Sequence, residues 1–113
     1  MTDSTQSDIP QTQVSALADD ATILDVREPD EWAAGHAPGA IHSPLGDLPT
    51  RLGDVPQDAP IAVVCRSGGR SSKAVEWLQR EGFDAINVEG GMRAWAQAGK
   101  PMVSDNTEEP QVI

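Results

Sequence analysis

The sequence predicts an α/β fold with a mainly parallel sheet, because short apolar runs alternate with helical patterns along the chain. The clearest strand candidate spans residues 60–65 (PIAVVC), which are apolar throughout and β-branched at three positions. A continuous apolar run of this kind is typical of a strand covered on both faces, as in a parallel sheet. Shorter runs at residues 21–26, 39–42 and 85–88 predict the other strands.

The segments between these runs carry helix signals. Pro29 suits the first turn of a helix that Gly35 can end. The longest predicted helix covers residues 71–81, with an apolar stripe along one face and Gly82 as its stop signal. Residues 91–98 predict a last short helix, and residues 44–52 predict a weak helix or a turn.

The length of 113 residues suits a single domain with one continuous core. By composition, residues 1–8 and 104–113 are predicted to be disordered tails, which leaves residues 9–103 as the folded domain. The first residues lack the basic and apolar regions of a secretory signal, and the longest apolar run, 61–65, is too short to cross a bilayer. We therefore expect a soluble, cytoplasmic protein.

Charge and cysteine content exclude several classes of function. The net charge is −10, from 18 acidic and 8 basic residues, so nucleic acid and anionic membranes are not expected partners. A single cysteine forms no intramolecular disulfide, which fits a reducing compartment. With two histidines and one cysteine, a zinc site would need carboxylates at no recognisable spacing, so we expect no metal and no cofactor.

The candidate active site is the loop that begins at Cys65. This cysteine ends the best strand and precedes the longest helix, at the sheet edge where ligands bind in open α/β folds. Gly68 and Gly69 allow successive N–H groups to point inward, and the following helix adds its positive end. Arg66 and Arg70 add full positive charges, and together these features favour a thiolate over a thiol.

A lone cysteine at the end of a strand is usually a buried packing residue. One cysteine, two glycines and two arginines within residues 65–70 favour a reactive, anionic cysteine instead. Ser67 and Ser71 either donate hydrogen bonds to the anion held in the loop or cap the helix. Asp25 and Arg27 end a neighbouring strand on the same side and are expected to support the site, with Arg27 paired to Glu31.

A series of short motifs follows in order along the chain: residues 24–27 (LDVR), 31–32 (EW), 35–36 (GH), 38–40 (PGA), 65–71 (CRSGGRS), 89–91 (EGG) and 94–95 (AW). Each is weak alone, but together they resemble the ordered motifs of the rhodanese family, over about residues 9–103. Ala37 departs from the isoleucine usual there. The resemblance implies a twisted, mainly parallel, five-stranded sheet with helices on both faces, and a thiosulfate sulfurtransferase that needs no cofactor.

The resemblance also implies a mechanism, in which Cys65 takes sulfane sulfur from thiosulfate or another persulfide donor and holds it as a persulfide. Arg66, Ser67, Gly68, Gly69, Arg70 and Ser71 would then bind the donor and stabilise the persulfide. The acceptor would be cyanide, a small thiol or a protein thiol. Arg66 is expected to face outward and attract the dianionic donor, whereas Arg70 either does the same or stabilises the loop.

Three other functions remain in view. A phosphatase also holds an anion in a cysteine–arginine loop, but that chemistry resembles Cys-x5-Arg, and four residues separate Cys65 from Arg70 here. A shorter loop suits a lone sulfur atom better than a tetrahedral phosphoryl group. A non-catalytic interaction module is disfavoured because the cysteine is present. A persulfide relay to one protein partner differs in the acceptor and keeps the same chemistry.

Overall fold

Five parallel strands form the sheet of this computed structural model, which describes residues 9–113. The strands are β1 (Gln11–Thr12), β2 (Thr22–Asp25), β3 (Ile41–His42), β4 (Ile61–Val64) and β5 (Ala85–Val88). Their order across the sheet is β1-β5-β4-β2-β3, so β4 is central and its neighbours are β5 and β2. The predicted α/β class and parallel five-stranded sheet are confirmed.

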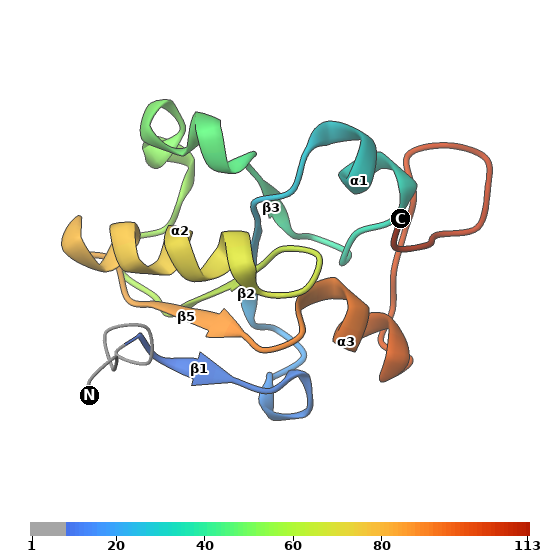
Figure 1. Cartoon of the computed structure of the whole chain (residues 1–113), viewed down its shortest axis with the longest axis horizontal. Coiled ribbons are helices and arrows are strands. Elements are labelled where there is room, and N and C mark those ends of the chain that lie inside the picture. Colours follow the sequence, from blue (N-terminus) through green and yellow to red (C-terminus); the bar gives the residue numbers. More distant parts are fainter. Residues whose placement is uncertain (1–8) are drawn as a thin grey trace.

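The helices are α1 (Pro29–Ala34), α2 (Gly69–Arg80) and α3 (Gly91–Gln97), as Figure 1 shows. Two consecutive 3-10 helices, Leu45–Thr50 and Leu52–Asp54, occupy the segment predicted as a weak helix or turn, and a third covers Val14–Ala16. Within residues 9–113, no helix has the length and apolar character needed to cross a membrane.

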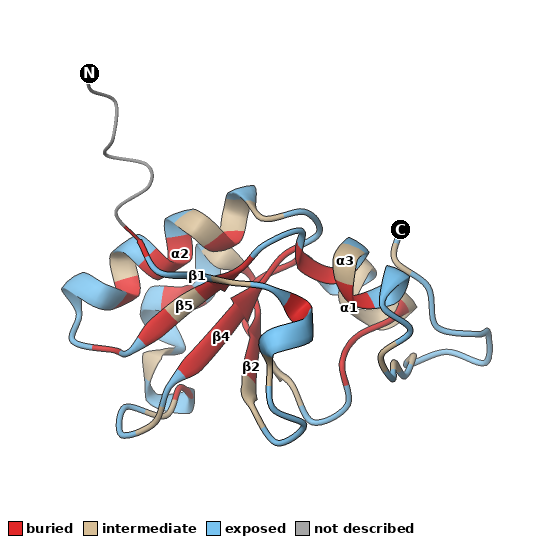
Figure 2. Ribbon diagram, turned by 90° about the horizontal axis from the view of Figure 1, so that it is seen from below, coloured by how far each residue is buried: buried red, intermediate tan, exposed pale blue. Residues whose placement is uncertain are grey.

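The central strand β4 is covered on both faces, as its apolar sequence predicts. Ile61 and Val63 pack in one cluster with the apolar stripe of α2, while Ala62 and Val64 pack in a second cluster with Trp95 of α3. This alternation follows from the two-residue repeat of a strand. Figure 2 shows the buried residues concentrated on the strands, with exposed residues on the outer helix faces. Cys65 therefore emerges from the best-anchored strand of the sheet.

The last ten residues, 104–113, pack against α1, which corrects their prediction as a disordered tail (Figure 1). The Asp105 N–H donates to the carbonyl of Ala33 at 2.9 Å, and the Gln111 N–H donates to the carbonyl of Ala34 at 2.9 Å. These carbonyls lie in the last turn of a helix, where no intrahelical partner exists, so the segment satisfies them. The predicted tail at residues 1–8 lies outside the described residues.

Candidate active site

The sulfur of Cys65 lies at the centre of the loop between β4 and α2. The residue is only 1% exposed, and its Sγ accepts a hydrogen bond from the Gly68 N–H at 3.0 Å. The hydroxyl of Ser71 lies 3.4 Å from the same sulfur. Gly68 has φ +122°, a conformation that side chains other than glycine rarely adopt. The glycine therefore lets the backbone turn its N–H toward the sulfur.

Hydrogen bonding outweighs burial at this sulfur. Burial has the largest single effect and raises the pKa of Cys65, because it disfavours the charged thiolate. The Ser71 hydroxyl and the N–H groups of Ser71, Gly68 and Ser67 act in the opposite direction, and the net pKa of Cys65 is lowered. A lower pKa increases the nucleophilic fraction of a thiol at neutral pH. The loop thus has the electrostatic property that its sequence predicts.

The start of α3 fixes the beginning of the loop. The N–H of Met92 donates to the Cys65 carbonyl at 2.8 Å, and the N–H of Arg93 donates to the Arg66 carbonyl at 3.0 Å. Gly91 precedes them with φ +53°, and a Cβ there would collide with the Cys65 carbonyl oxygen. The glycines of the motif at residues 89–91 therefore permit a backbone approach that the sequence alone did not explain.

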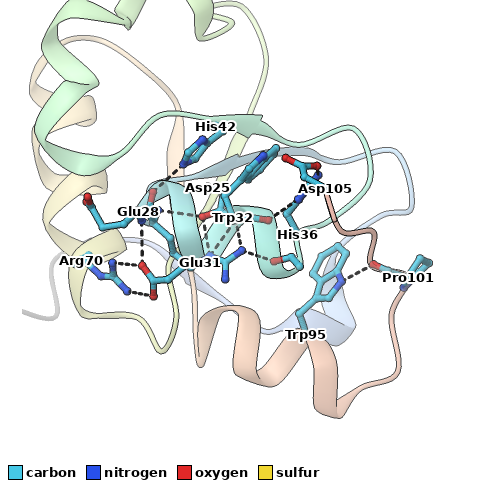
Figure 3. A network of polar contacts seen from close by, with 12 residues as sticks. Asp25, Glu28, Glu31, Trp32, His36, His42, Arg70, Trp95, Pro101 and Asp105 are labelled. Carbon is cyan, nitrogen blue, oxygen red and sulfur yellow. Dashed lines mark hydrogen bonds and ion pairs between the residues drawn. The ribbon is translucent and has the colours of Figure 1, made fainter. Parts of the chain in front are cut away.

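The two arginines of the loop have different surroundings. Arg66 is exposed, and its Nε donates to the backbone carbonyl of Ile113 at 3.0 Å. Arg70 forms a two-point ion pair with Glu31, Nη1 to Oε1 at 2.7 Å and Nη2 to Oε2 at 2.9 Å (Figure 3). This pair connects α2 to α1, so of the two roles predicted for Arg70 the geometry favours loop stabilisation.

The Arg70–Glu31 pair is strong enough to perturb both groups. The hydrogen bond from Arg70 is the largest influence on Glu31 and lowers the pKa of its carboxyl from 4.5 to about 2. In return, the hydrogen bond from Glu31 raises the pKa of Arg70. Arg70 is therefore a fixed cation beside the cysteine loop, neutralised by its partner.

Asp25 and Arg27 form a separate, fully buried pair at the end of β2. Arg27 Nε donates to Asp25 Oδ1 at 2.9 Å, and Arg27 Nη2 donates to Asp25 Oδ2 at 2.8 Å and to the Gly35 carbonyl at 2.7 Å. The expected pairing of Arg27 with Glu31 is therefore wrong, because the nearer carboxylate two residues away takes the guanidinium. Within residues 9–113, the hydrogen bonds of this pair hold the end of α1 and none reaches the cysteine loop.

Aromatic stacking holds α1, the helix whose Glu31 pairs with Arg70. The ring of Trp32 stacks on two imidazoles, with centroids 3.6 Å from His36 and 4.5 Å from His42, and the ring planes of each pair are nearly parallel. The ring of His36 also bonds to the Trp32 carbonyl at 2.8 Å (Figure 3). This stack orients the helix that carries Glu31.

Sequence reasoning missed Asn87 as a neighbour of the site. The residue lies in β5, is 3% exposed, and its side-chain oxygen is 2.5 Å from the Ser71 hydroxyl. A polar side chain inside the short apolar run at residues 85–88 was the available signal, because buried amides normally have hydrogen-bond partners. Asn87 therefore joins the group of side chains around Cys65.

Comparison with known proteins gives consistent matches. A family model described as Rhodanese-like domain matches residues 10–98. A sulfurtransferase from Allochromatium vinosum is 36% identical over 94 residues, which is 82% of this chain and 88% of the relative. A rhodanese-like domain protein from Staphylococcus aureus superposes with TM-score 0.72 at 34% identity, over 77% of this chain and 91% of that one. A Rhodopseudomonas palustris protein described as a possible tyrosine phosphatase superposes with TM-score 0.74 at 28% identity, over 86% of each chain.

Proposed function

We propose that this chain, which belongs to the rhodanese-like family and is a sulfurtransferase of that superfamily, transfers sulfane sulfur through a persulfide on Cys65. The observation that carries the proposal is the environment of the Cys65 sulfur. This sulfur lies at the end of the central strand and accepts a hydrogen bond from the Gly68 N–H, and the pKa of Cys65 is lowered. A nucleophilic sulfur in a ring of N–H groups suits a reaction that places an anionic sulfur at the same point.

In the first step, the Cys65 thiolate attacks the outer sulfur of thiosulfate. A new S–S bond forms to Cys65, the S–S bond of thiosulfate breaks, and sulfite leaves with the bonding electron pair. The enzyme then carries a persulfide anion, so total charge is conserved. The N–H groups that stabilise the thiolate are the donors nearest to this new anion. A small persulfide donor would react by the same displacement, with a thiolate as leaving group.

In the second step, a thiophilic acceptor removes the terminal sulfur. Cyanide attacks that sulfur, the persulfide S–S bond breaks, and thiocyanate leaves while the Cys65 thiolate is regenerated. A small thiol or a protein thiolate would accept the sulfur in the same way and become a persulfide. The two-step route needs a nucleophile that is also a good leaving group, which a cysteine of lowered pKa provides.

Arg66 is the loop arginine suited to attract the donor. Arg70 is already neutralised by a partly buried side-chain partner, Glu31, whereas Arg66 is exposed and its described side-chain contact is to a main-chain oxygen of Ile113, the last residue of the sequence. The chain as a whole has net charge −10 and repels dianions. A local positive charge at the entrance therefore raises the encounter rate with thiosulfate.

A phosphatase is the second candidate, favoured by the structural likeness to the Rhodopseudomonas palustris protein. Phosphoryl transfer would need a free arginine facing the oxygens of the transferred group. Arg70, which ends the loop, points its guanidinium at Glu31, and only four residues separate it from Cys65. We therefore infer sulfur transfer rather than phosphoryl transfer.

Intact mass after incubation with thiosulfate tests the proposal. The wild-type chain should gain the mass of one sulfur atom and lose it again when cyanide is added, with release of thiocyanate. Cys65→Ser is the matched control and should gain nothing. Hydrolysis of an aryl phosphate, without any sulfur gain from thiosulfate or small persulfides, would refute the proposal and favour the phosphatase.

A further inference from the structure

The Ser71 hydroxyl is surrounded by three groups that can accept its hydrogen. Its oxygen lies 3.4 Å from the Cys65 sulfur, 3.2 Å from the Gly68 carbonyl and 2.5 Å from Oδ1 of Asn87. Ser71 is fully buried at the start of α2, so water does not offer a competing partner. A serine hydroxyl carries one hydrogen and can direct it at one acceptor at a time.

Asn87 is held so that its side-chain oxygen faces Ser71. Its Nδ2 donates to Oε1 of Gln11 in β1 at 2.9 Å and lies 3.1 Å from the Ser72 hydroxyl. The Ser72 hydroxyl in turn donates to the Gly68 carbonyl at 2.7 Å. Both ends of the Asn87 amide are therefore engaged, and the oxygen is the end presented to Ser71.

The distances rank the three acceptors. Oxygen-to-oxygen hydrogen bonds are shortest when they are strongest, and the contact to Asn87 is at the short end of the normal range. The Gly68 carbonyl already accepts from Ser72, and the sulfur already accepts from the Gly68 N–H. Asn87 Oδ1 is thus the favoured acceptor of the Ser71 hydrogen while Cys65 is a neutral thiol.

We propose that Asn87 is a positioning residue that holds the Ser71 hydroxyl away from the Cys65 sulfur and so limits how strongly that hydroxyl stabilises the thiolate. The inference rests on the proposed function, because it concerns the same nucleophile. When Cys65 ionises, its proton passes to solvent and the sulfur becomes a better acceptor. The Ser71 hydroxyl can then turn to the sulfur only by giving up its bond to Asn87.

This competition gives Asn87 control over reactivity without contact with the sulfur. A cysteine whose thiolate accepts fewer hydrogen bonds has a higher pKa, and that thiolate is intrinsically more nucleophilic. The Asn87 side chain therefore sets the balance between the fraction of Cys65 that is ionised and the nucleophilicity of the thiolate. The charged groups on the elements around the loop are Arg66 in the loop itself, Asp30 and Glu31 on α1, Arg70, Lys73, Glu76 and Arg80 on α2, and Arg93 on α3. The substitutions below leave all of them in place.

The pH dependence of Cys65 alkylation by iodoacetamide tests this inference on the full chain. Asn87→Leu removes the acceptor and keeps the number and branching of the side-chain heavy atoms, so the hydroxyl is free to turn to the sulfur. We expect the alkylation midpoint to fall by about half a pH unit or more, since a hydrogen bond to a charged group is among the stronger ones. The same substitution in a Ser71→Ala background should produce no such fall, because no hydroxyl remains to be released.

Two further variants separate this role from a structural one. Asn87→Asp keeps an acceptor oxygen but adds a negative charge that raises the midpoint by itself. It is therefore compared with the same substitution in the Ser71→Ala background, where the rise should be smaller because no hydroxyl is held. Gln11→Ala removes one of the two partners of the Asn87 amide nitrogen and leaves the Ser72 hydroxyl to hold its orientation, so the midpoint should shift much less than in Asn87→Leu. Circular dichroism and the melting temperature of each variant establish that it is folded, and Asn87→Asp serves as the test should Asn87→Leu fail to fold.

Equal shifts from Asn87→Leu with and without the Ser71 hydroxyl would overturn the inference. So would a rise in the midpoint for Asn87→Leu that depends on Ser71, or a rise for Asn87→Asp that is no smaller in the Ser71→Ala background. Alkylation needs no sulfur donor, so the result is independent of the mass measurement that tests sulfur transfer. Failure of the positioning role and failure of the proposed function are therefore distinguishable.

Discussion

Replacing Glu31 with glutamine removes the carboxylate that Arg70 contacts at 2.7 and 2.9 Å and leaves the size of the side chain almost unchanged. In the folded chain the pKa of this carboxyl is about 2, against an ordinary value of 4.5. A shift of that size corresponds to an upper limit of about 3 kcal/mol at neutral pH. The Arg70 side chain is 34% exposed, so solvent screening reduces the expected contribution to about 1 kcal/mol.

The pH dependence has a definite sign. Because folding lowers the pKa of Glu31, the carboxylate stabilises the fold fully above about 4.5 and progressively less as the pH falls toward 2. Urea denaturation of the wild type and Glu31→Gln should therefore differ by about 1 kcal/mol at pH 7, and the difference should shrink markedly at pH 3.

A double-mutant cycle with Arg70→Gln identifies the partner. The coupling free energy at pH 7 should be close to the loss from either single substitution, since each removes the same ion pair. Two results would refute the reasoning: a wild-type advantage that is the same at pH 3 and pH 7, or a coupling near zero. Either would mean that the ion pair adds little to stability and that α1 is held by other contacts, such as the stacking of Trp32 on His36 and His42.

Three other perturbations follow from the site and the C-terminal segment. Cys65→Ser should keep the melting temperature and reduce thiocyanate formation to background, because a hydroxyl does not hold a persulfide; retained turnover would exclude the mechanism. Arg66→Ala should raise the KM for thiosulfate about fivefold, in line with about 1 kcal/mol for a surface charge, and a neutral persulfide donor should be affected less. High salt should mimic that change in the wild type, and equal losses for both donors would assign Arg66 to loop structure. Removing residues 105–113 should lower the free energy of unfolding by about 1–2 kcal/mol, because two α1 carbonyls lose their partners; an unchanged denaturation midpoint would contradict the docking.

Most of the fold could be predicted because its central elements have clear local signals. Residues 60–65 are apolar throughout, and the observed strand β4 covers four of them, Ile61–Val64. The helix predicted at 71–81 is present as α2, which begins two residues earlier, at Gly69. Gly68 is the N-cap of this helix and Gly69 its first residue, where sequence propensity argues against a helix.

The missed elements depend on contacts far along the chain. Strand β1 consists of two polar residues, Gln11 and Thr12, and exists because they pair with Asn87 and Val88 of β5. The segment 104–113 is polar and acidic, and it docks because α1 offers two carbonyls without intrahelical partners. Local composition predicts neither the pairing of β1 nor the packing of the C-terminal segment, because both depend on which backbone groups the rest of the folded chain leaves without partners.

The cysteine loop shows the same limit at the level of single side chains. Its sequence predicts an anionic sulfur surrounded by glycines and arginines, and the Gly68 N–H bond and the lowered pKa of Cys65 agree with that prediction. The sequence treats Arg66 and Arg70 alike, because both are basic and both flank the same glycines. Within residues 9–113, only Arg70 of these two meets a side-chain carboxylate, and that carboxylate belongs to a residue 39 positions earlier, Glu31 of α1. In the proposed mechanism, this pairing removes one positive charge from the entrance and leaves Arg66 to attract the donor. The electrostatic attraction of an anionic donor therefore depends on a residue outside the loop as much as on the loop itself.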